Sequence, residues 1–393
     1  MSGIYIHIPF CKQACHYCDF HFSTSLKKKG EMIAALAKEI ELRKSELLDS
    51  ARSVSEVVET IYFGGGTPSI LQVSDLKLLI DAVYKNYKVV ENPEITIEAN
   101  PDDLISQALS FRAQSRNLYE EYHSIGINRL SIGIQSFFED DLKLMNRAHN
   151  SAEAKECLAL ASQYFDNISL DLIYGIPGMS NEKWLQNIET ALSFNIPHIS
   201  SYALTVEPKT ALHTFIQKGI IPQPDDEVAQ EHFQILVDKL TENNFIHYEL
   251  SNFGKENYFS KNNSSYWLGK KYIGIGPSAH SYDGEKRGWN VSNNTLYIKS
   301  IQENKLPLET EILSKTDRYN EYIMTGLRTI WGISLDRIEN EFGKSYLDYL
   351  NQQSAKYIED HLLFVDENVL RTTKNGKFLS DGIASDLFLL NLE

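Results

Sequence analysis

Three cysteines near the amino terminus constrain this chain more than any other feature of its sequence. Cys11, Cys15 and Cys18 form a C-x3-C-x2-C pattern directly after Ile4–Ile8, whose β-branched alternation predicts a strand. Thiolates are soft ligands that select iron–sulfur clusters, zinc or copper(I) over hard cations. Four cysteines in 393 residues are too few for a disulfide framework, so the pattern favours a metal site in a reducing compartment.

Two kinds of metal site fit these three thiolates. A [4Fe–4S] cluster held by three cysteines leaves one iron without a protein ligand and open to a small molecule. A structural zinc site would need a fourth ligand, for which His16 and His21 are the nearest candidates. A chance group of buried cysteines is the third interpretation. The spacing alone leaves these alternatives open.

The first 205 residues alternate strand-like and helical patterns, which predicts a parallel sheet. The predicted strands are Ile4–Ile8, Val57–Phe63, Glu94–Ala99, Arg129–Ile134, Ile168–Tyr174 and His198–Leu204. Helical periodicity separates them over Met32–Leu48, Leu76–Tyr84, Glu153–Tyr164 and Trp184–Phe194. We therefore expect an α/β fold, a partial (β/α)6 barrel whose functional face lies at the carboxyl ends of its strands.

The pattern changes after residue 205, and we predict three regions: 1–205, 206–305 and 306–393. The middle region is expected to extend the sheet and complete the cleft, with short strands near Phe245–Leu250 and Tyr272–Ile275. The pattern of the last region predicts a winged-helix-like α+β domain, in which helices precede a small hairpin. Its helices are predicted at Thr316–Thr329, Ser334–Phe342 and Ser345–Glu359, and its hairpin turns at Asp366–Asn368.

Glycines and polar residues follow several of the predicted strands. Gly64–Pro68 ends the second strand, and glycines there let the backbone approach a ligand and offer it bare N–H groups. Glu98, Gln135, Arg147 and Asp171 stand at or after the ends of the next three strands. In a barrel such groups face a common opening at the carboxyl ends of the strands. Burying them costs free energy unless they are paired or bind a ligand. A salt-bridge network that closes the barrel, for example between Arg147 and a carboxylate, is the alternative.

Together these features resemble the radical S-adenosylmethionine (radical SAM) superfamily. The segment Cys11-x3-Cys15-His16-Tyr17-Cys18 matches its CxxxCxxC signature, and the glycine segment matches the one that holds the methionine amino group. The resemblance implies a [4Fe–4S] cluster on the three cysteines that passes an electron to the sulfonium of SAM. The SAM contacts that it implies are Tyr5, Tyr17, Gly65, Gly66, Thr67, Glu98, Gln135, Arg147 and Asp171.

Segments through most of the chain narrow the resemblance to the oxygen-independent coproporphyrinogen III oxidases and their relatives. Among them are YIHIPFC, YFGGGTPS, RLSIGIQSF, SSYALTVEPKT and YIGIGPSAHSY. The family contains decarboxylases of porphyrin biosynthesis and HemW-type heme chaperones. Asp19 and Phe20 stand where the decarboxylase has a further cysteine, and only three residues precede Ile4, where it has an extension. The resemblance therefore implies a chaperone that delivers heme to an acceptor protein, with decarboxylation as the alternative.

One element bears on heme binding. Asn263-x-x-Tyr266-Trp267 is similar to the HNxxYW element of the chaperones, whose histidine is the natural candidate for an axial ligand. Asn262 replaces that histidine, and an amide is a poor iron ligand. Either heme binds through another group, such as His247 or His280, or the affinity for heme is altered. An ordinary hydrogen-bonded structural role is the alternative for both histidines.

The composition bears on partners and location. A net charge of −15 argues against a duplex nucleic acid as partner. The sequence has no apolar run of the length that spans a bilayer, and its first residues lack the pattern of a secretion signal. We expect a cytoplasmic protein that contacts membranes only through a partner, and a flavodoxin or ferredoxin as electron donor if it is catalytic. A zinc-stabilised interaction module is the alternative from another class.

Overall fold

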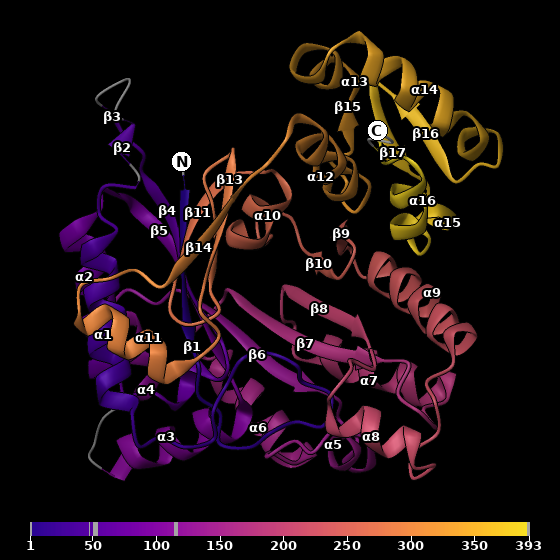
Figure 1. Cartoon of the computed structure of the whole chain (residues 1–393). Helices are drawn as coiled ribbons and strands as arrows, with labels where there is room; N and C mark the ends of the chain where they lie inside the picture. The colour runs from indigo at the N-terminus through magenta and orange to yellow at the C-terminus, as the bar shows by residue number, and fades with distance from the viewer. Residues whose placement is uncertain (1, 47, 50–53, 114–116, 391–393) are drawn as a thin grey trace.

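A large mixed sheet organises the protein. The computed structural model describes residues 2–46, 48–49, 54–113 and 117–390. Within them, one sheet has twelve strands in the order β14-β13-β12-β11-β1-β4-β5-β6-β7-β8-β10-β9, and it occupies the centre of Figure 1. The strands that run parallel are β1 (Ser2–Ile8), β4 (Val58–Gly65), β5 (Val89–Ala99), β6 (Arg129–Gln135), β7 (Ile168–Tyr174), β8 (His198–Ala203) and β11 (Lys271–Ile275).

Helices connect the parallel strands, because a tight hairpin cannot join two strands that run the same way. They are α1 (Lys29–Leu42), η1 (Pro68–Ile70), α2 (Val73–Asn86), α3 (Pro101–Ala113), α4 (Leu118–Ser124), α5 (Glu139–Leu144), α6 (Ser151–Ala161) and α7 (Asn181–Ser193). A small ribbon of β2 (Leu48–Asp49) and β3 (Val54–Ser55) precedes β4. The predicted partial (β/α)6 arrangement is confirmed. Among the described strands the sheet stays open, with β14 and β9 at its edges.

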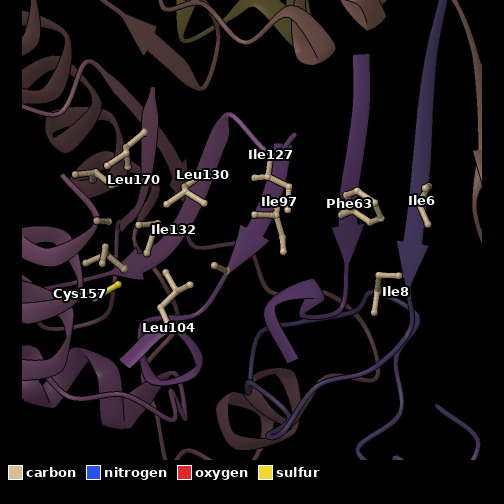
Figure 2. Close-up of a cluster of buried hydrophobic side chains, with 14 of the residues drawn as sticks. Ile6, Ile8, Phe63, Ile97, Leu104, Ile127, Leu130, Ile132, Cys157 and Leu170 are labelled. Carbon is tan, nitrogen blue, oxygen red and sulfur yellow. The ribbon is translucent and has the colours of Figure 1, made fainter. Parts of the chain in front are cut away.

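The parallel strands have two different faces, because successive side chains of a strand point to opposite sides. Ile6 and Ile8 of β1 point to the side of the helices, where Figure 2 shows them with Leu104 of α3 and Cys157 of α6 in one apolar cluster. Cys157 is fully buried there, as the helical pattern around it predicts. Tyr5 points to the opposite side, which we call the inner face.

Residues 206–312 extend the sheet at both edges. The elements are α8 (Ala211–Gln217), α9 (Asp226–Glu242), β9 (Ile246–Glu249), β10 (Asn252–Gly254), α10 (Lys261–Trp267), β12 (His280–Tyr282), β13 (Lys286–Asn290), α11 (Asn294–Gln302) and β14 (Leu308–Ile312). The sequence predicts β9 and β11 but misses β12, β13, α10 and α11, which are too short to show a clear periodicity. β14 lies beyond the predicted boundary at residue 305 and still belongs to this sheet.

The C-terminal residues build a second apolar core around a small antiparallel sheet, β15-β17-β16. Its elements are α12 (Lys315–Leu327), β15 (Ile333–Ser334), α13 (Leu335–Arg337), the π-helix η2 (Ile338–Phe342), α14 (Lys344–Glu359), β16 (Leu363–Asp366), β17 (Val369–Thr372), α15 (Lys374–Lys377) and α16 (Ser380–Asp386). The predicted hairpin is confirmed, and Glu367 and Asn368 turn it with φ of 48° and 62°, as in a type I′ turn. The helix predicted over Ser334–Phe342 is instead a strand end, one helical turn and a π-helix.

The C-terminal core contacts the sheet at its β9 edge. The amide of Ile330 donates to the carbonyl of Tyr248 at 3.0 Å, and the ring of Tyr248 lies 6.3 Å from that of Trp331. Lys377 Nζ donates to the carbonyl of His247 at 3.2 Å. These contacts cover backbone groups that an edge strand would otherwise expose.

Candidate functional site

The cysteine loop follows β1 and is held against two neighbouring loops. The amide of Cys11 donates to the carbonyl of Ser23 at 3.1 Å, and Thr67 Oγ1 donates to Cys11 Sγ at 3.4 Å. Arg147 Nη1 donates to Cys15 Sγ at 3.4 Å. The segments that follow β1, β4 and β6 therefore meet at the carboxyl ends of the strands, where chemistry is expected in this kind of sheet.

A cavity of about 430 Å³ lies beside the three thiols. The predicted site residues that line it are Cys11, Cys15, Tyr17, Cys18, Gly65, Gly66, Thr67, Glu98, Gln135, Arg147 and Asp171. Tyr5 does not line it: its hydroxyl lies 3.2 Å from His7 Nδ1 and its ring stacks on Tyr62. The structure thus brings together all but one of the predicted residues, while the contact of each with a cofactor stays a prediction.

The glycine segment packs against the start of the cysteine loop. Gly66 and Thr67 donate their N–H groups to the carbonyls of Ile8 and Phe10 at 2.9 Å and 2.7 Å. A Cβ at Gly66 would lie 2.6 Å from the Phe10 carbonyl oxygen, so only glycine fits this approach. The amide of Gly65 donates to a carboxylate of β5 at 3.1 Å. Each of these N–H groups is thus hydrogen-bonded within the protein, and a contact of this segment with a cofactor stays a prediction.

Two carboxylates share the cavity wall. Glu98 accepts hydrogen bonds from Tyr62 Oη at 2.9 Å and from the amide of Gly65 at 3.1 Å. Burial raises the pKa of Glu98 to about 7, and the nearby charge of Asp171 adds to the rise, although the Tyr62 hydrogen bond opposes it. Burial also raises the pKa of Asp171 to about 6. A carboxyl group in this range can donate a proton as well as accept a hydrogen bond near neutral pH.

Arg147 is the cation that lines this cavity together with the carboxylates. Its Nη2 donates to Asn100 Oδ1 at 2.7 Å and to the Gly133 carbonyl at 2.8 Å. Its Nε is buried without a hydrogen-bond partner in the described chain, and an unpaired buried donor costs free energy. Among the described residues it forms no ion pair with Glu98 or Asp171, so the structure lacks the salt-bridge network that the sequence left as an alternative.

Gln135 ends β6 in a left-handed backbone conformation, with φ of 67°. The pairing of β6 with β7 shifts register between Gly133 and Gln135, which places an irregularity at the cavity wall. Residues other than glycine rarely adopt this conformation, and such strain is often retained at functional positions. The sequence marks Gln135 by its place at a strand end and carries no signal for its conformation.

The zinc alternative gains no support from the structure. His16 Nδ1 hydrogen-bonds with the carbonyl of Leu144 at 2.8 Å, and His21 Nε2 with Asn294 Oδ1 at 2.8 Å. In the part of the chain that the structure describes, no three histidine, cysteine or acidic side chains are arranged to hold a single metal ion. The three thiols border a cavity instead, as a larger metal group would need.

The residues considered for heme ligation lie apart from this cavity. Asn262 is 3% exposed, and its Oδ1 accepts a hydrogen bond from Thr60 Oγ1 at 3.1 Å near the amino end of β4. The cysteine loop follows the carboxyl end of β1, which runs parallel to β4, so the two features lie at opposite ends of the strands. His247 is buried and hydrogen-bonds with the carbonyl of Leu250 at 3.1 Å, whereas His280 is exposed.

Sequence reasoning missed several residues of the cavity. Asn100 links two predicted positions, since it accepts from Arg147 and donates to Thr67 Oγ1 at 3.3 Å. Its place directly after a predicted strand was the available signal. The other missed lining residues include Asp19, Phe20, Phe22, Ser131, Tyr202, Leu204 and Glu207.

Comparisons with known proteins identify the family of this chain. Residues 5–197 match the Radical SAM superfamily and residues 313–379 match the HemN C-terminal domain. The heme chaperone HemW of Bacillus subtilis is 34% identical over 98% of this chain and 98% of its own length. That of Lactococcus lactis is 31% identical over 99% and 97%.

Two further relatives extend the comparison. The mitochondrial radical S-adenosyl methionine domain-containing protein 1 of Danio rerio is 30% identical, over 100% of this chain and 88% of its own length. The solved structure of Escherichia coli coproporphyrinogen III oxidase, HemN, has a TM-score of 0.82 at 21% identity and covers 98% of this chain and 90% of that one. At that identity the likeness concerns the fold.

We expect Glu98→Gln to weaken the pH dependence of stability in the cofactor-free protein. Burial raises the pKa of Glu98 from 4.5 to about 7. Between these two pH values the folded protein holds a proton that the unfolded chain releases. Its stability is therefore greatest below the unfolded pKa and falls as pH rises through the folded one, by up to about 1.4 kcal/mol for each unit of pKa difference.

Urea unfolding at about pH 5 and about pH 8 measures this effect. The wild-type protein should lose more stability between the two values than the variant does. Asp171→Asn serves as a second variant, because the pKa of Asp171 is raised in the same direction. Equal losses in Glu98→Gln and wild type would contradict the expectation.

We expect Asn262→His to lower the melting temperature without creating a heme site. Imidazole is larger than the amide, which is packed beside Thr60 and lies 3.5 Å from where a Cβ of Gly3 would be. Overpacking of this kind costs about 1–3 kcal/mol. Asn263→His is the matched control, since Asn263 is half-buried. A tighter heme complex at an unchanged melting temperature would show that position 262 is accessible after all.

Proposed function

Because the chain belongs to the HemW family of the radical SAM superfamily, we propose that it is a heme chaperone with a radical SAM core. In this proposal Cys11, Cys15 and Cys18 hold a [4Fe–4S] cluster, SAM occupies the adjacent cavity, and the protein delivers heme to an acceptor protein. The cofactor part rests on one observation: three thiols, a buried guanidinium and two carboxylates line the same cavity. The heme part rests on relatives that are named heme chaperones and that match this chain over almost their full length.

The donor set suits a cluster. Three cysteine thiolates leave one iron of a [4Fe–4S] cluster open for a further ligand. Burial raises the pKa of both Cys11 and Cys18 to about 11, so metal binding must displace protons from these thiols. Thr67 and Arg147 donate hydrogen bonds to cysteine sulfurs, and such bonds stabilise the charge of a metal-bound thiolate.

The remaining cavity residues suit the parts of SAM. When bound, the cluster would supply one electron to the sulfonium of SAM. Arg147 carries a positive charge at the cavity wall, which fits the methionine carboxylate. Asp171 and Gln135 offer acceptors and donors for ribose hydroxyls, and Glu98 faces the same space. Tyr17 closes the pocket beside Arg147, at 3.5 Å from Nη1.

Oxidative decarboxylation of coproporphyrinogen III is the second candidate activity. It is favoured by the fold, which matches that of HemN over nearly the whole chain. Against it, Asp19 and Phe20 follow Cys18 in place of a further cysteine, and Phe20 is 67% exposed beside the cavity. Because the chain is similar to a HemW relative over its full length, we favour the heme chaperone over the decarboxylase.

Partners and location follow from the proposed role. We propose a cytoplasmic protein that hands heme to an acceptor, with a flavodoxin or ferredoxin as electron donor where radical chemistry is used. Within the described residues, no helix is both long and apolar enough to cross a bilayer. Contact with a membrane would then come through the acceptor alone.

Cys11→Ala should abolish cluster binding, because it removes one of three thiolate ligands. Iron and sulfide analysis and the visible absorbance of anaerobically reconstituted protein measure the loss, from about four irons per chain to almost none. Cys157→Ala is the matched control, since Cys157 is buried in the apolar cluster. A full iron complement in Cys11→Ala would disprove the ligand assignment, and zinc without iron in the wild type would favour the interaction-module alternative.

Heme titration tests the chaperone role. We expect a saturable shift of the Soret band at heme concentrations of about micromolar, and transfer of the bound heme to a heme-free acceptor protein. Incubation with coproporphyrinogen III, SAM and a reductant serves as the comparison and should give no protoporphyrinogen. Absence of saturable binding would defeat the chaperone proposal, and formation of protoporphyrinogen would establish the second candidate.

A further inference from the structure

Asn146 occupies a backbone position where glycine is usual. It follows α5 in a left-handed conformation, with φ of 56°. Its backbone N–H donates to the Lys143 carbonyl at 3.1 Å, and that of Arg147 donates to the Leu142 carbonyl at 2.9 Å. These two bonds form the Schellman motif that ends many helices, in which glycine is the commonest residue and asparagine takes its place in some. The backbone alone therefore requires no side chain at this position.

The side chain of Asn146 binds the cysteine loop. Its Nδ2 donates to the carbonyl of Ala14 at 2.7 Å, and its Oδ1 accepts from Gln13 Nε2 at 2.9 Å. Gln13 Nε2 also lies 2.9 Å from the carbonyl oxygen of Asn146. The donor and the acceptor of one side-chain amide are thus both used on the stretch between Cys11 and Cys15.

The end of α5 also holds the next part of the loop. The backbone N–H of His16 donates to the Met145 carbonyl at 3.0 Å, and His16 Nδ1 donates to the Leu144 carbonyl at 2.8 Å. These two carbonyls directly precede Asn146 in the chain. The loop is therefore bound to one short segment on both sides of its second cysteine.

Arg147 follows Asn146 and contacts both the cysteine loop and the cavity. Its Nη1 donates to Cys15 Sγ at 3.4 Å, and its side chain lines the cavity. In the proposed function Cys15 ligates the cluster, and Arg147 binds the methionine carboxylate of SAM. Because Asn146 ties the loop to the residue directly before Arg147, it fixes the metal ligand relative to the residue that would bind SAM.

We propose that Asn146 is a positioning residue that holds Cys15 and Arg147 in one arrangement, and that Gln13 is its partner in the loop. The proposal rests on the radical SAM part of the proposed function and is independent of heme binding. Since glycine suits the same backbone conformation, loss of the amide should weaken SAM binding while the fold is kept.

Asn146→Gly isolates the contribution of the side chain. We expect the cluster-loaded variant to bind SAM about tenfold more weakly than wild type, as the loss of two hydrogen bonds predicts. The measurement is the change that added SAM causes in the EPR spectrum of the reduced cluster, normalised to iron content. Asn195→Gly is the matched control, because Asn195 is exposed and follows α7 with the same φ of 56°.

Gln13→Ala tests the same contact from the side of the loop. It should also weaken SAM binding, and the double variant with Asn146→Gly should lose less than the sum of the two single losses, because both changes remove one shared hydrogen bond. Full additivity would show that the two residues act separately and would overturn the proposed pair.

A measurement without cofactors separates positioning from stability. In the cofactor-free protein, Asn146→Gly should speed hydrogen exchange in the peptide that contains residues 11–18, because the loop loses contacts that limit its local opening. Its melting temperature should stay close to that of Asn195→Gly. A melting temperature far below that of the control would assign Asn146 a general stabilising role and overturn the proposal.

The outcomes distinguish this proposal from the proposed function. A wild-type protein that acquires no cluster, or whose cluster spectrum SAM does not change, would defeat the radical SAM function and the positioning role with it. Wild-type binding of SAM with an unaltered affinity in Asn146→Gly would overturn the positioning role alone and leave the function standing.

Discussion

The contact between the cysteine loop and the glycine segment is the constraint on which the site depends. Gly66 and Thr67 donate to backbone carbonyls at the start of the loop, and Thr67 also donates to Cys11. A side chain at position 66 would collide with that backbone. The carboxyl ends of two neighbouring strands are thereby joined, and the thiols are held on the side of the cavity before any metal is bound.

The sequence predicts which residues line the cavity because each motif involved lies within a few consecutive positions. The cysteine spacing, the glycine segment and the polar residues at strand ends each carry a signal within a few positions, and parallel strands bring them to one edge. The sequence could not show that the ring of Tyr5 stacks on Tyr62 outside the cavity lining, or that the glycine amides are hydrogen-bonded within the protein. Both follow from contacts between strands. The position of Asn262 at the far end of the strands likewise depends on where α10 packs.

The polar groups of the cavity wall form hydrogen bonds, but among the described residues the two carboxylates form no ion pair with Arg147. Arg147 lines the same cavity as Glu98 and Asp171, yet its guanidinium bonds to an amide, a carbonyl and a thiol, and its Nε has no partner in the described chain. Burial raises the pKa of each carboxyl group, and for Asp171 the positive charge of Arg147 only partly opposes the rise. Buried carboxyl groups without an ionic partner lower the stability of the folded chain. A ligand with complementary charge would recover that free energy, so the arrangement favours a bound cofactor over an empty cavity.

The position of β1 within the sheet has a consequence for biogenesis. β1 precedes the other described strands along the chain, yet one of its neighbours is β11, which ends at Ile275. One edge of β1 therefore stays unpaired during synthesis until β11 has been made, and the attached cysteine loop lacks its final support during that time. Insertion of a metal group would then follow translation. Products that stop before β11 would present reactive thiols beside an open strand, a feature that invites aggregation and proteolytic removal.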